Sequence, residues 1–459
     1  MIEVIITAFW NLIKNFFSRM SPMKIILLGF VTLILAGTVL LSLPVSARSG
    51  ESTPFLESCF TATSAVCVTG LVKFDTHNYW SLFGQGVILA LIQVGGMGFM
   101  TICISAISVT KKKIGLNSRE IMQSSISAPH IGGIVKMTRF VLLGTLTVEL
   151  VGAALLAIDF CPRYGLAKGL WFSLFHSISA FCNAGFDLMG GEGDFSSLTG
   201  LSSDIYVCTV ISILIILGGL GFFVWRDILD CRFKFSKFRL QTKTVIIMSV
   251  SLIFGGALIL YLVEMKAAGG RAESVFAQAG GALFQSVSAR TAGFNTINLA
   301  QMTHSGLFVM IILMIIGGSP GSTAGGMKTT TFAILLSSVV STFKRRKSAE
   351  MLGRRLEESA TRLAMCVFML YILLSTSVAV VIATLEDVPF INALFESASA
   401  VATVGLTTGI TPGLGAVSSV LLMLLMLFGR VGSLTMLFAI SSFKSHPQSQ
   451  KPLERIQIG

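Results

Sequence analysis

Charged residues are scarce in this 459-residue chain, where they make up 12% of the total. Soluble domains carry about 25% charged residues, so the composition does not favour a soluble globular protein. Hydrophobic residues account for 53% of the chain, and the mean hydropathy is +0.82. The sequence therefore indicates a membrane protein.

Residue patterns that would indicate catalysis or a bound cofactor are also missing from the sequence. The eight cysteines include no C-x-x-C pair and lie mostly in apolar segments, which is typical of buried small hydrophobic residues. No His and Cys cluster has metal-ligand spacing, and no nucleophile accompanies a base. The segment PGSTAGGMKTT approximates a nucleotide-binding P-loop, but Met327 separates Gly326 from Lys328 and no strand precedes it. We predict that the chain is not an enzyme and carries no cofactor of its own.

Long apolar runs predict membrane-spanning helices, because about 18 or more such residues can cross a bilayer. Glu149 interrupts one run, and glycine, proline or a basic residue interrupts two others. Eight segments qualify on this basis, at about 25–43, 81–110, 140–158, 205–225, 244–263, 305–343, 363–385 and 413–443. Residues 1–23 lack the basic start and cleavage site of a signal peptide. They are predicted to form an amphipathic helix at the membrane surface.

A motif lies between the two members of each pair of long segments. Its four copies read FTATSAVCVTGL at 60–71, FHSISAFCNAGF at 175–186, FQSVSARTAGF at 284–294 and FESASAVATVGL at 395–406. Their glycines are spaced 115, 108 and 112 residues apart, at Gly70, Gly185, Gly293 and Gly405. A motif this unusual at so regular a period indicates an internal repeat.

Each motif copy begins as a predicted helix too short to span the membrane, at about 54–65, 167–181, 273–288 and 389–402. The chain must then return without helical structure, which is tolerated only inside protein or along a water-filled cavity. We predict an all-α polytopic membrane protein with four helix–pore-loop–helix repeats. Its eight transmembrane helices and four half-helices would have pseudo-fourfold symmetry around one pore. The predicted divisions are an N-terminal segment 1–23, repeats 24–110, 111–226, 227–343 and 344–443, and a tail 444–459.

The net charge of +12 is unevenly distributed along the chain. Of the 34 Lys and Arg residues, 25 lie in the two tails and in the links between repeats, at 111–139, 226–243 and 344–362. Because basic residues favour the cytoplasmic side of a membrane, both termini and these links are predicted to be cytoplasmic. The distribution does not favour a nucleic-acid partner. The basic links are candidate docking surfaces, although the positive-inside bias alone would also explain them.

The repeated loop has the chemistry of a cation filter. A cation that leaves water must exchange its hydration shell for other oxygen atoms, which rings of backbone carbonyls can supply. Glycine allows successive carbonyls to face one axis, because it adopts backbone conformations closed to other residues. The short helices are predicted to direct their negative C-terminal ends at the pore centre, which favours a cation.

The four loops and paired helices resemble the Trk/Ktr/HKT superfamily of potassium transporters over about residues 24–443. Eight long helices without extra N-terminal spans look most similar to the Ktr-type membrane subunit. In that family a glycine in each filter loop is associated with potassium, and serine in the first loop with sodium preference. The resemblance implies a potassium filter formed by Val68, Thr69, Gly70, Asn183, Ala184, Gly185, Thr291, Ala292, Gly293, Thr403, Val404 and Gly405. The third loop is one residue shorter than the others, which leaves its carbonyl register near Arg290 open.

The second long helix of each pair carries a second repeated motif, whose four copies read VGGMGF, LGGLGF, IGGSPGS and FGRVGS. Close helix packing through small residues explains the first two copies, whereas the third should break its helix. That break resembles the family's intramembrane gating loop. The predicted gate comprises Gly317, Gly318, Ser319, Gly321, Ser322, Thr323, Gly325, Gly326, Lys328 and Arg430. A lone membrane charge such as Arg430 favours a functional role, either as a barrier to cations or as a tether for the loop.

The resemblance also implies potassium as the transported ion and sodium as a candidate activator. It implies a homodimer in the plasma (inner) membrane, each subunit with its own pore, on a cytosolic ring of nucleotide-binding regulatory subunits. Two alternatives stay open, an ion-coupled secondary transporter and a poorly selective sodium/potassium channel of the same fold. Glu149 would favour the first, either as a proton relay or as a simple helix contact. Polar residues on the short helices would anchor them or tune the outer mouth, namely Glu57, His176, Gln285 and Glu396.

Overall fold

The computed structural model describes residues 22–98, 134–191, 193–267, 275–346, 348–432 and 436. Within these ranges the chain is mostly helical, with one antiparallel hairpin of β1 (Glu350–Met351) and β2 (Arg354–Arg355). The predicted surface helix at 1–23, the basic link at 111–133 and the C-terminal tail lie outside the described residues, apart from Pro22 and Met23.

The helices follow one another in four groups that match the four sequence repeats and are called the first to the fourth group in chain order. Their bounds are α2 (Pro22–Ser42), η1 (Pro44–Ser46), α3 (Phe55–Cys67), α4 (Thr76–Tyr79), α5 (Leu82–Met97), α8 (Ile134–Tyr164), α9 (Leu166–Cys182), η2 (Thr199–Leu201), α10 (Ile205–Leu220), α11 (Phe222–Asp230), η3 (Phe235–Lys237), α12 (Leu240–Ala267), α13 (Val275–Ser288), η4 (Leu299–Gln301), α14 (His304–Ile315), α15 (Thr329–Phe343), α16 (Glu358–Glu386), α17 (Phe390–Ala402), η5 (Thr411–Gly413) and α18 (Ala416–Val431).

Four of these helices, α2, α8, α12 and α16, are long and apolar enough to cross a membrane. The bent pair α10 and α11 makes a fifth candidate span, and six shorter apolar helices accompany them in the described part. The long helices expose large apolar side chains, such as Leu150 on α8 and Phe254 on α12, each 63% exposed. A surface of this kind suits lipid, so the chain is a multi-pass membrane protein.

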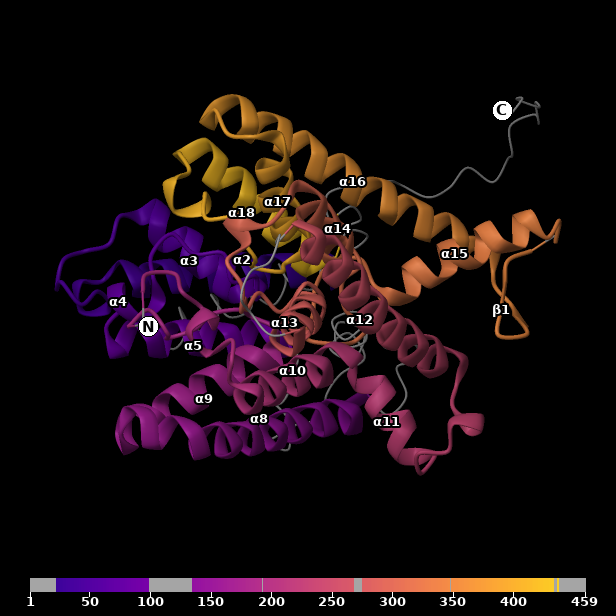
Figure 1. Ribbon diagram of the computed structural model, residues 1–459, viewed down its shortest axis with the longest axis horizontal. Helices are drawn as coiled ribbons and strands as arrows, with labels where there is room; N and C mark the ends of the chain where they lie inside the picture. The colour runs from indigo at the N-terminus through magenta and orange to yellow at the C-terminus, as the bar shows by residue number, and fades with distance from the viewer. Residues whose placement is uncertain are drawn as a thin grey trace, which may run out of the picture.

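The four short helices α3, α9, α13 and α17 lie inside the bundle, and the first phenylalanine of each motif copy is buried. Each short helix packs against the long helix before it, and α3, α9 and α17 also pack against the second helix of their own group, α5, α10 and α18. Each also meets a helix from the preceding group, since α5 packs against α9, α10 against α13, α14 against α17 and α18 against α3. The last contact closes a ring. Figure 1 shows α8 and α16 on opposite sides of the molecule.

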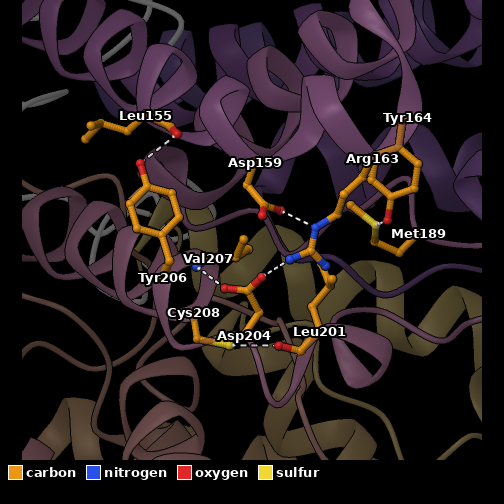
Figure 2. Close-up of polar contacts among 10 residues, drawn as sticks. All are labelled: Leu155, Asp159, Arg163, Tyr164, Met189, Leu201, Asp204, Tyr206, Val207 and Cys208. Carbon is orange, nitrogen blue, oxygen red and sulfur yellow. Dashed lines mark hydrogen bonds and ion pairs between the residues drawn. The ribbon is translucent and has the colours of Figure 1, made fainter.

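A polar network fastens the second group at the end where α8 stops and α10 begins (Figure 2). Arg163 forms ion pairs with Asp159, at 2.8 Å, and with Asp204. Asp204 also caps α10 by accepting a hydrogen bond from the Val207 amide. Tyr206 donates to the carbonyl of Leu155 at 2.9 Å. Because charged side chains are costly inside a bilayer, this cluster of charged groups marks an end of the membrane-spanning region.

The second helices depart from the straight spans that the sequence predicts. Within the predicted spans 81–110 and 413–443, α5 ends before Gly98 and α18 before Gly432, and these glycines have φ values of +82° and +93°. The sequence predicts one helix over 205–225, but α10 ends at Leu220 and α11 turns away from it by 90°. Gly221 adopts a φ of +94° at the bend, a conformation that a glycine reaches without strain. The break predicted in the third group is present, because α14 ends at Ile315 and α15 begins only at Thr329.

Candidate ion pathway

The four motif copies end their helices in the same backbone conformation. The residue after each helix or turn adopts a left-handed φ between 51° and 74°, and the glycine two positions later has a φ between 69° and 94°. The left-handed residues are Val68, Asn183, Thr291 and Thr403, and the glycines are Gly70, Gly185, Gly293 and Gly405. The chain thus turns sharply off each helix and returns in a conformation that requires glycine.

The four glycines form a closed ring of backbone contacts. A Cβ atom added to any of them would lie less than 3.0 Å from a carbonyl oxygen of a neighbouring loop. These carbonyls belong in turn to Ala184, Ala292, Val404 and Thr69, so the contacts run from the first loop to the second, third, fourth and back to the first. No side chain fits between adjacent loops without displacing backbone. The ring therefore brings all four predicted filter segments together.

The shorter third loop keeps the same register through a tighter turn. In the other three copies, the amide of the residue before glycine donates to the carbonyl of the motif serine five residues earlier, at 2.8 Å. In the third copy Ala292 donates to Ser288, four residues earlier, at 2.9 Å. The missing residue is therefore removed from the helix end and not from the filter segment, which resolves the register left open near Arg290.

The motif serines hold the returning chain in two different ways. Ser64 and Ser399 accept hydrogen bonds from the amides of Gly70 and Gly405, each at 3.0 Å. Ser179 instead donates to the carbonyl of Phe186 at 2.6 Å, and Ser288 donates likewise to Phe294. The sequence does not indicate this division, because all four copies carry the same serine at this motif position.

Three hydroxyls in the predicted filter segments are buried and have no hydrogen-bond partner among the described residues. They belong to Thr69, Thr291 and Thr403. The helices α3, α9 and α17 end directly before their segments, and α13 ends two residues before its own, so their negative C-terminal ends converge on the ring. Carbonyls, hydroxyls and helix ends of this kind together favour a cation.

The segment 316–328 contacts the second and the fourth motif copies. Its two ends pair, because the amide of Gly317 donates to the Met327 carbonyl at 2.8 Å. Thr323 donates its hydroxyl to the Phe181 carbonyl, at the end of α9, at 3.0 Å. Further along, the Cα of Gly325 faces the Thr403 hydroxyl. The predicted gate residues between 317 and 328 therefore form one closed loop against the helix ends that precede the predicted filter segments.

Arg430 connects this loop to the first group. Its guanidinium donates hydrogen bonds to the carbonyls of Thr323, Gly95 and Gly96, the last at 2.9 Å. These contacts are those of a tether, one of the two roles, tether or barrier, that the sequence allows for Arg430. The partners Gly95 and Gly96 were not among the predicted gate residues, because a backbone carbonyl leaves no mark in the sequence.

Lys328 closes the loop on itself. Its ammonium donates to the carbonyls of Ala324, at 2.9 Å, and Gly325, at 3.3 Å. Both basic residues of the predicted gate thus bind loop carbonyls.

Other polar residues highlighted by the sequence have structural partners. Arg290 is buried and donates to the Ser249 hydroxyl of α12 at 3.1 Å. Glu149 accepts from the Gln93 amide at 2.9 Å, which makes it a contact between α8 and α5. Glu396 accepts hydrogen bonds from Thr407, Thr408 and Thr411.

His176 and Gln285 occupy the same motif position as Glu396 but differ in their contacts. The His176 ring accepts from the Leu188 amide at 3.3 Å, which anchors the chain beyond the second filter segment. Gln285 is buried, and neither of its amide atoms has a partner among the described residues. Glu57 is half-buried in the first turn of α3.

Asp187 is a candidate residue that the sequence analysis missed. It lies two residues after Gly185, and its carboxylate accepts from the Met189 amide at 3.0 Å. The pKa of this carboxyl is raised to about 7, because burial and the nearby Asp75 raise it by more than the Met189 hydrogen bond lowers it. The signal available in the sequence was an acidic residue two positions after Gly185, one of the predicted filter glycines.

The fold and the ring are those of a multi-pass membrane protein whose short helices meet at four glycines. The family model of TrkH, described as a cation transport protein, matches residues 18–451. The chain therefore belongs to this family, and within the Trk/Ktr superfamily it is a Ktr-type membrane subunit.

Several relatives are similar over nearly their whole length. The potassium/sodium uptake protein NtpJ of Enterococcus hirae is 39% identical, covering 97% of this chain and 99% of the relative. The Ktr system potassium uptake protein B of Bacillus subtilis is 36% identical, covering 92% and 94%. The crystal structure of the potassium transporter TrkH from Vibrio parahaemolyticus superposes with a TM-score of 0.71 at 18% identity, over 92% of this chain and 86% of that one. The last match concerns the fold alone. These relatives are cation transporters and not enzymes.

Proposed function

We propose that this chain takes up potassium across the plasma membrane through the ring of four loops. The observation that carries the proposal is the closed series of contacts among Gly70, Gly185, Gly293 and Gly405. Backbone packed this closely can offer carbonyl oxygens from four sides of one axis, which is what a dehydrated potassium ion requires. The relatives named for potassium uptake support the same ion.

In this proposal the filter residues are 68–70, 183–185, 291–293 and 403–405. Their carbonyls, with the unpartnered hydroxyls of Thr69, Thr291 and Thr403, replace the hydration shell of the ion. The four repeats 24–110, 111–226, 227–343 and 344–443 surround one pore with pseudo-fourfold symmetry and eight membrane spans. The ring of helix contacts that closes from α18 to α3 supports this arrangement.

The loop at 317–328 is the proposed gate. It lies against the ends of α9 and α17, where contacts of Thr323 and Arg430 hold it, and Lys328 fixes its internal shape. Movement of the loop would require those hydrogen bonds to break, so any partner that weakens them would open the path. The charges of Arg430 and Lys328 would add an electrostatic barrier to a cation as long as the loop stays in place.

We further propose the cellular arrangement implied by the family. Both termini and the basic links lie in the cytoplasm, since basic residues favour that side. Two copies form a homodimer on a cytosolic ring of nucleotide-binding regulatory subunits, and sodium is a candidate activator. Within the link at 344–362, the exposed Arg354 and Arg355 support docking on the cytoplasmic side.

A second candidate is a pathway that passes sodium and potassium alike. It is favoured by the relative at 39% identity, whose name includes both ions. The two candidates differ in the ratio of potassium to sodium flux.

Potassium uptake by a bacterium that lacks its own potassium transporters tests the proposal. The chain should restore growth at low potassium when expressed with a regulatory partner, and less without it. Tracer fluxes of both cations would separate the two candidates. If membrane-inserted protein restores no uptake with the partner present, the proposed function is wrong.

A further inference from the structure

The bend between α10 and α11 places a helix across the end of a membrane span. The 16 residues of α10 measure about 24 Å at 1.5 Å per residue, slightly less than a hydrocarbon core of about 30 Å. Asp204 and Arg163 mark one end of this span. The 90° turn at Gly221 directs α11 toward the start of α8, where the Arg226 guanidinium lies 5.6 Å from the centre of the Phe140 ring. The start of α8 also carries the basic residues Lys136 and Arg139, so we place α11 near the opposite boundary, at the depth of the headgroups.

The loop that follows α11 exposes basic and aromatic side chains in alternation. It reads Arg232-Phe233-Lys234-Phe235, and all four residues are exposed, with Phe233 at 74% and Phe235 at 48%. Phe238 is buried and fixes the end of the loop. Aromatic rings beside basic groups are typical of segments that lie in a membrane interface.

The positive charge of this surface is not neutralised by its own acidic residues. Asp230 pairs with Arg226 at 2.9 Å, and Asp227 lies 3.7 Å from Arg239. Arg232, Lys234 and Lys237 are exposed and form no ion pair within the described ranges. Three unpaired basic side chains at headgroup depth suit the phosphate of an anionic lipid.

The same bend touches the proposed gate. The Phe222 amide, at the start of α11, donates to the Gly321 carbonyl at 2.8 Å. The Ser319 and Thr323 amides donate to the last carbonyls of α10, those of Gly219 and Gly218. The orientation of α11 is thus connected to the loop by direct backbone hydrogen bonds.

We propose that α11 and the loop 231–239 form a binding surface for anionic phospholipid headgroups of the inner leaflet, and that this lipid holds the gate loop in place. Lipid bound to the bent α11 stabilises the conformation in which Phe222 holds Gly321, so anionic lipid lowers flux. The inner-leaflet assignment and the effect on flux rest on the proposed function, whereas lipid binding itself does not.

Binding is measured on the full chain reconstituted in vesicles, with Phe233→Trp as a reporter. Quenching by brominated phosphatidylglycerol is compared with quenching by brominated phosphatidylcholine, and the signal of the chain with native Phe233 is subtracted. We expect clearly stronger quenching by the anionic lipid. Equal quenching by the two lipids would overturn the proposal, even if the protein transports potassium.

Two double variants separate this surface from general positive charge. Lys234→Gln with Lys237→Gln should weaken the preference for anionic lipid by about fivefold for each residue removed. Arg354→Gln with Arg355→Gln removes two charges from the β1–β2 hairpin, which lies toward the same end of the molecule as α11, opposite α4 (Figure 1), and should leave the preference intact. Equal effects of the two double variants would contradict a specific surface.

Potassium flux in the same vesicles tests the connection to the gate. Flux should be severalfold lower in phosphatidylglycerol than in phosphatidylcholine, and the Lys234/Lys237 variant should lose most of that difference. Loss of regulatory-subunit binding in that variant, with its lipid preference unchanged, would assign the surface to a protein partner and overturn the proposal. Absence of flux in every lipid would count against the proposed function, and the quenching result would still decide lipid binding.

Discussion

The contacts of Arg430 allow its two candidate roles to be separated by substitution. As a tether, Arg430 holds the gate loop through hydrogen bonds to Thr323, Gly95 and Gly96. Hydrogen bonds from a charged group contribute about 1.5–3 kcal/mol each. Lysine keeps the positive charge but cannot bridge separate carbonyls with a planar fork. Arg430→Lys should therefore cost the tether about 2 kcal/mol and shift the loop toward its released state about thirtyfold.

The assay is initial potassium flux into vesicles that contain equal amounts of folded protein. Arg430→Lys and Arg430→Met should both raise basal flux if the tether dominates. If repulsion dominates instead, Arg430→Met should raise flux and Arg430→Lys should remain at the wild-type level. That second pattern would refute the tether, and an unchanged flux in both variants would refute the loop as a gate.

Three further predictions concern other parts of the pathway. Deletion of residues 321–325 removes Thr323 with its contacts and should raise flux about as much as Arg430→Met. Combining the deletion with Arg430→Met should raise flux no further. Wild-type flux in the deletion variant would contradict the gate. Because burial raises the pKa of Asp187 to about 7, this carboxylate is charged above that pH and neutral below it. Uptake at low potassium should therefore fall as external pH drops from 8 to 6, whereas Asp187→Asn should give a flat, lower profile. Glu396→Leu leaves three threonine donors without their acceptor and should destabilise the protein by about 2–4 kcal/mol, seen as a lower unfolding temperature than for Glu396→Gln.

Local patterns in the sequence were sufficient to predict the short helices and their returns. The helix predicted at about 389–402 is found at Phe390–Ala402, and that at about 54–65 at Phe55–Cys67. Apolar length, a proline cap and a glycine are local signals, so they can be read without knowledge of packing. The break between Ile315 and Thr329 was predictable for the same reason, because several glycines and a proline interrupt an apolar run.

Features that depend on contacts between distant segments could not be predicted. The helix break at Gly221 in LGGLGF has a local signal, because α5 likewise ends before Gly98, with a φ of +82°, in the similar VGGMGF. The direction in which α11 leaves α10 depends instead on tertiary contacts. The Cα of Gly221 lies against the Pro320 carbonyl, and the Phe222 amide bonds to Gly321. The tether is similar, since Arg430 finds carbonyls more than 300 residues away in sequence at Gly95 and Gly96.

The most direct test of the filter is the ratio of potassium to sodium flux in glycine variants of the first repeat. Gly70 has a φ of +91° and faces the Ala184 carbonyl, whereas Gly86 in α5 has open space around it. A side chain at position 70 costs about 1–2 kcal/mol in backbone strain alone and must displace the neighbouring loop. Gly70→Ser should therefore lower the potassium-to-sodium ratio about tenfold, and Gly86→Ser should leave it unchanged. An unchanged ratio in folded Gly70→Ser protein would contradict the assignment of the glycine ring as the selectivity filter.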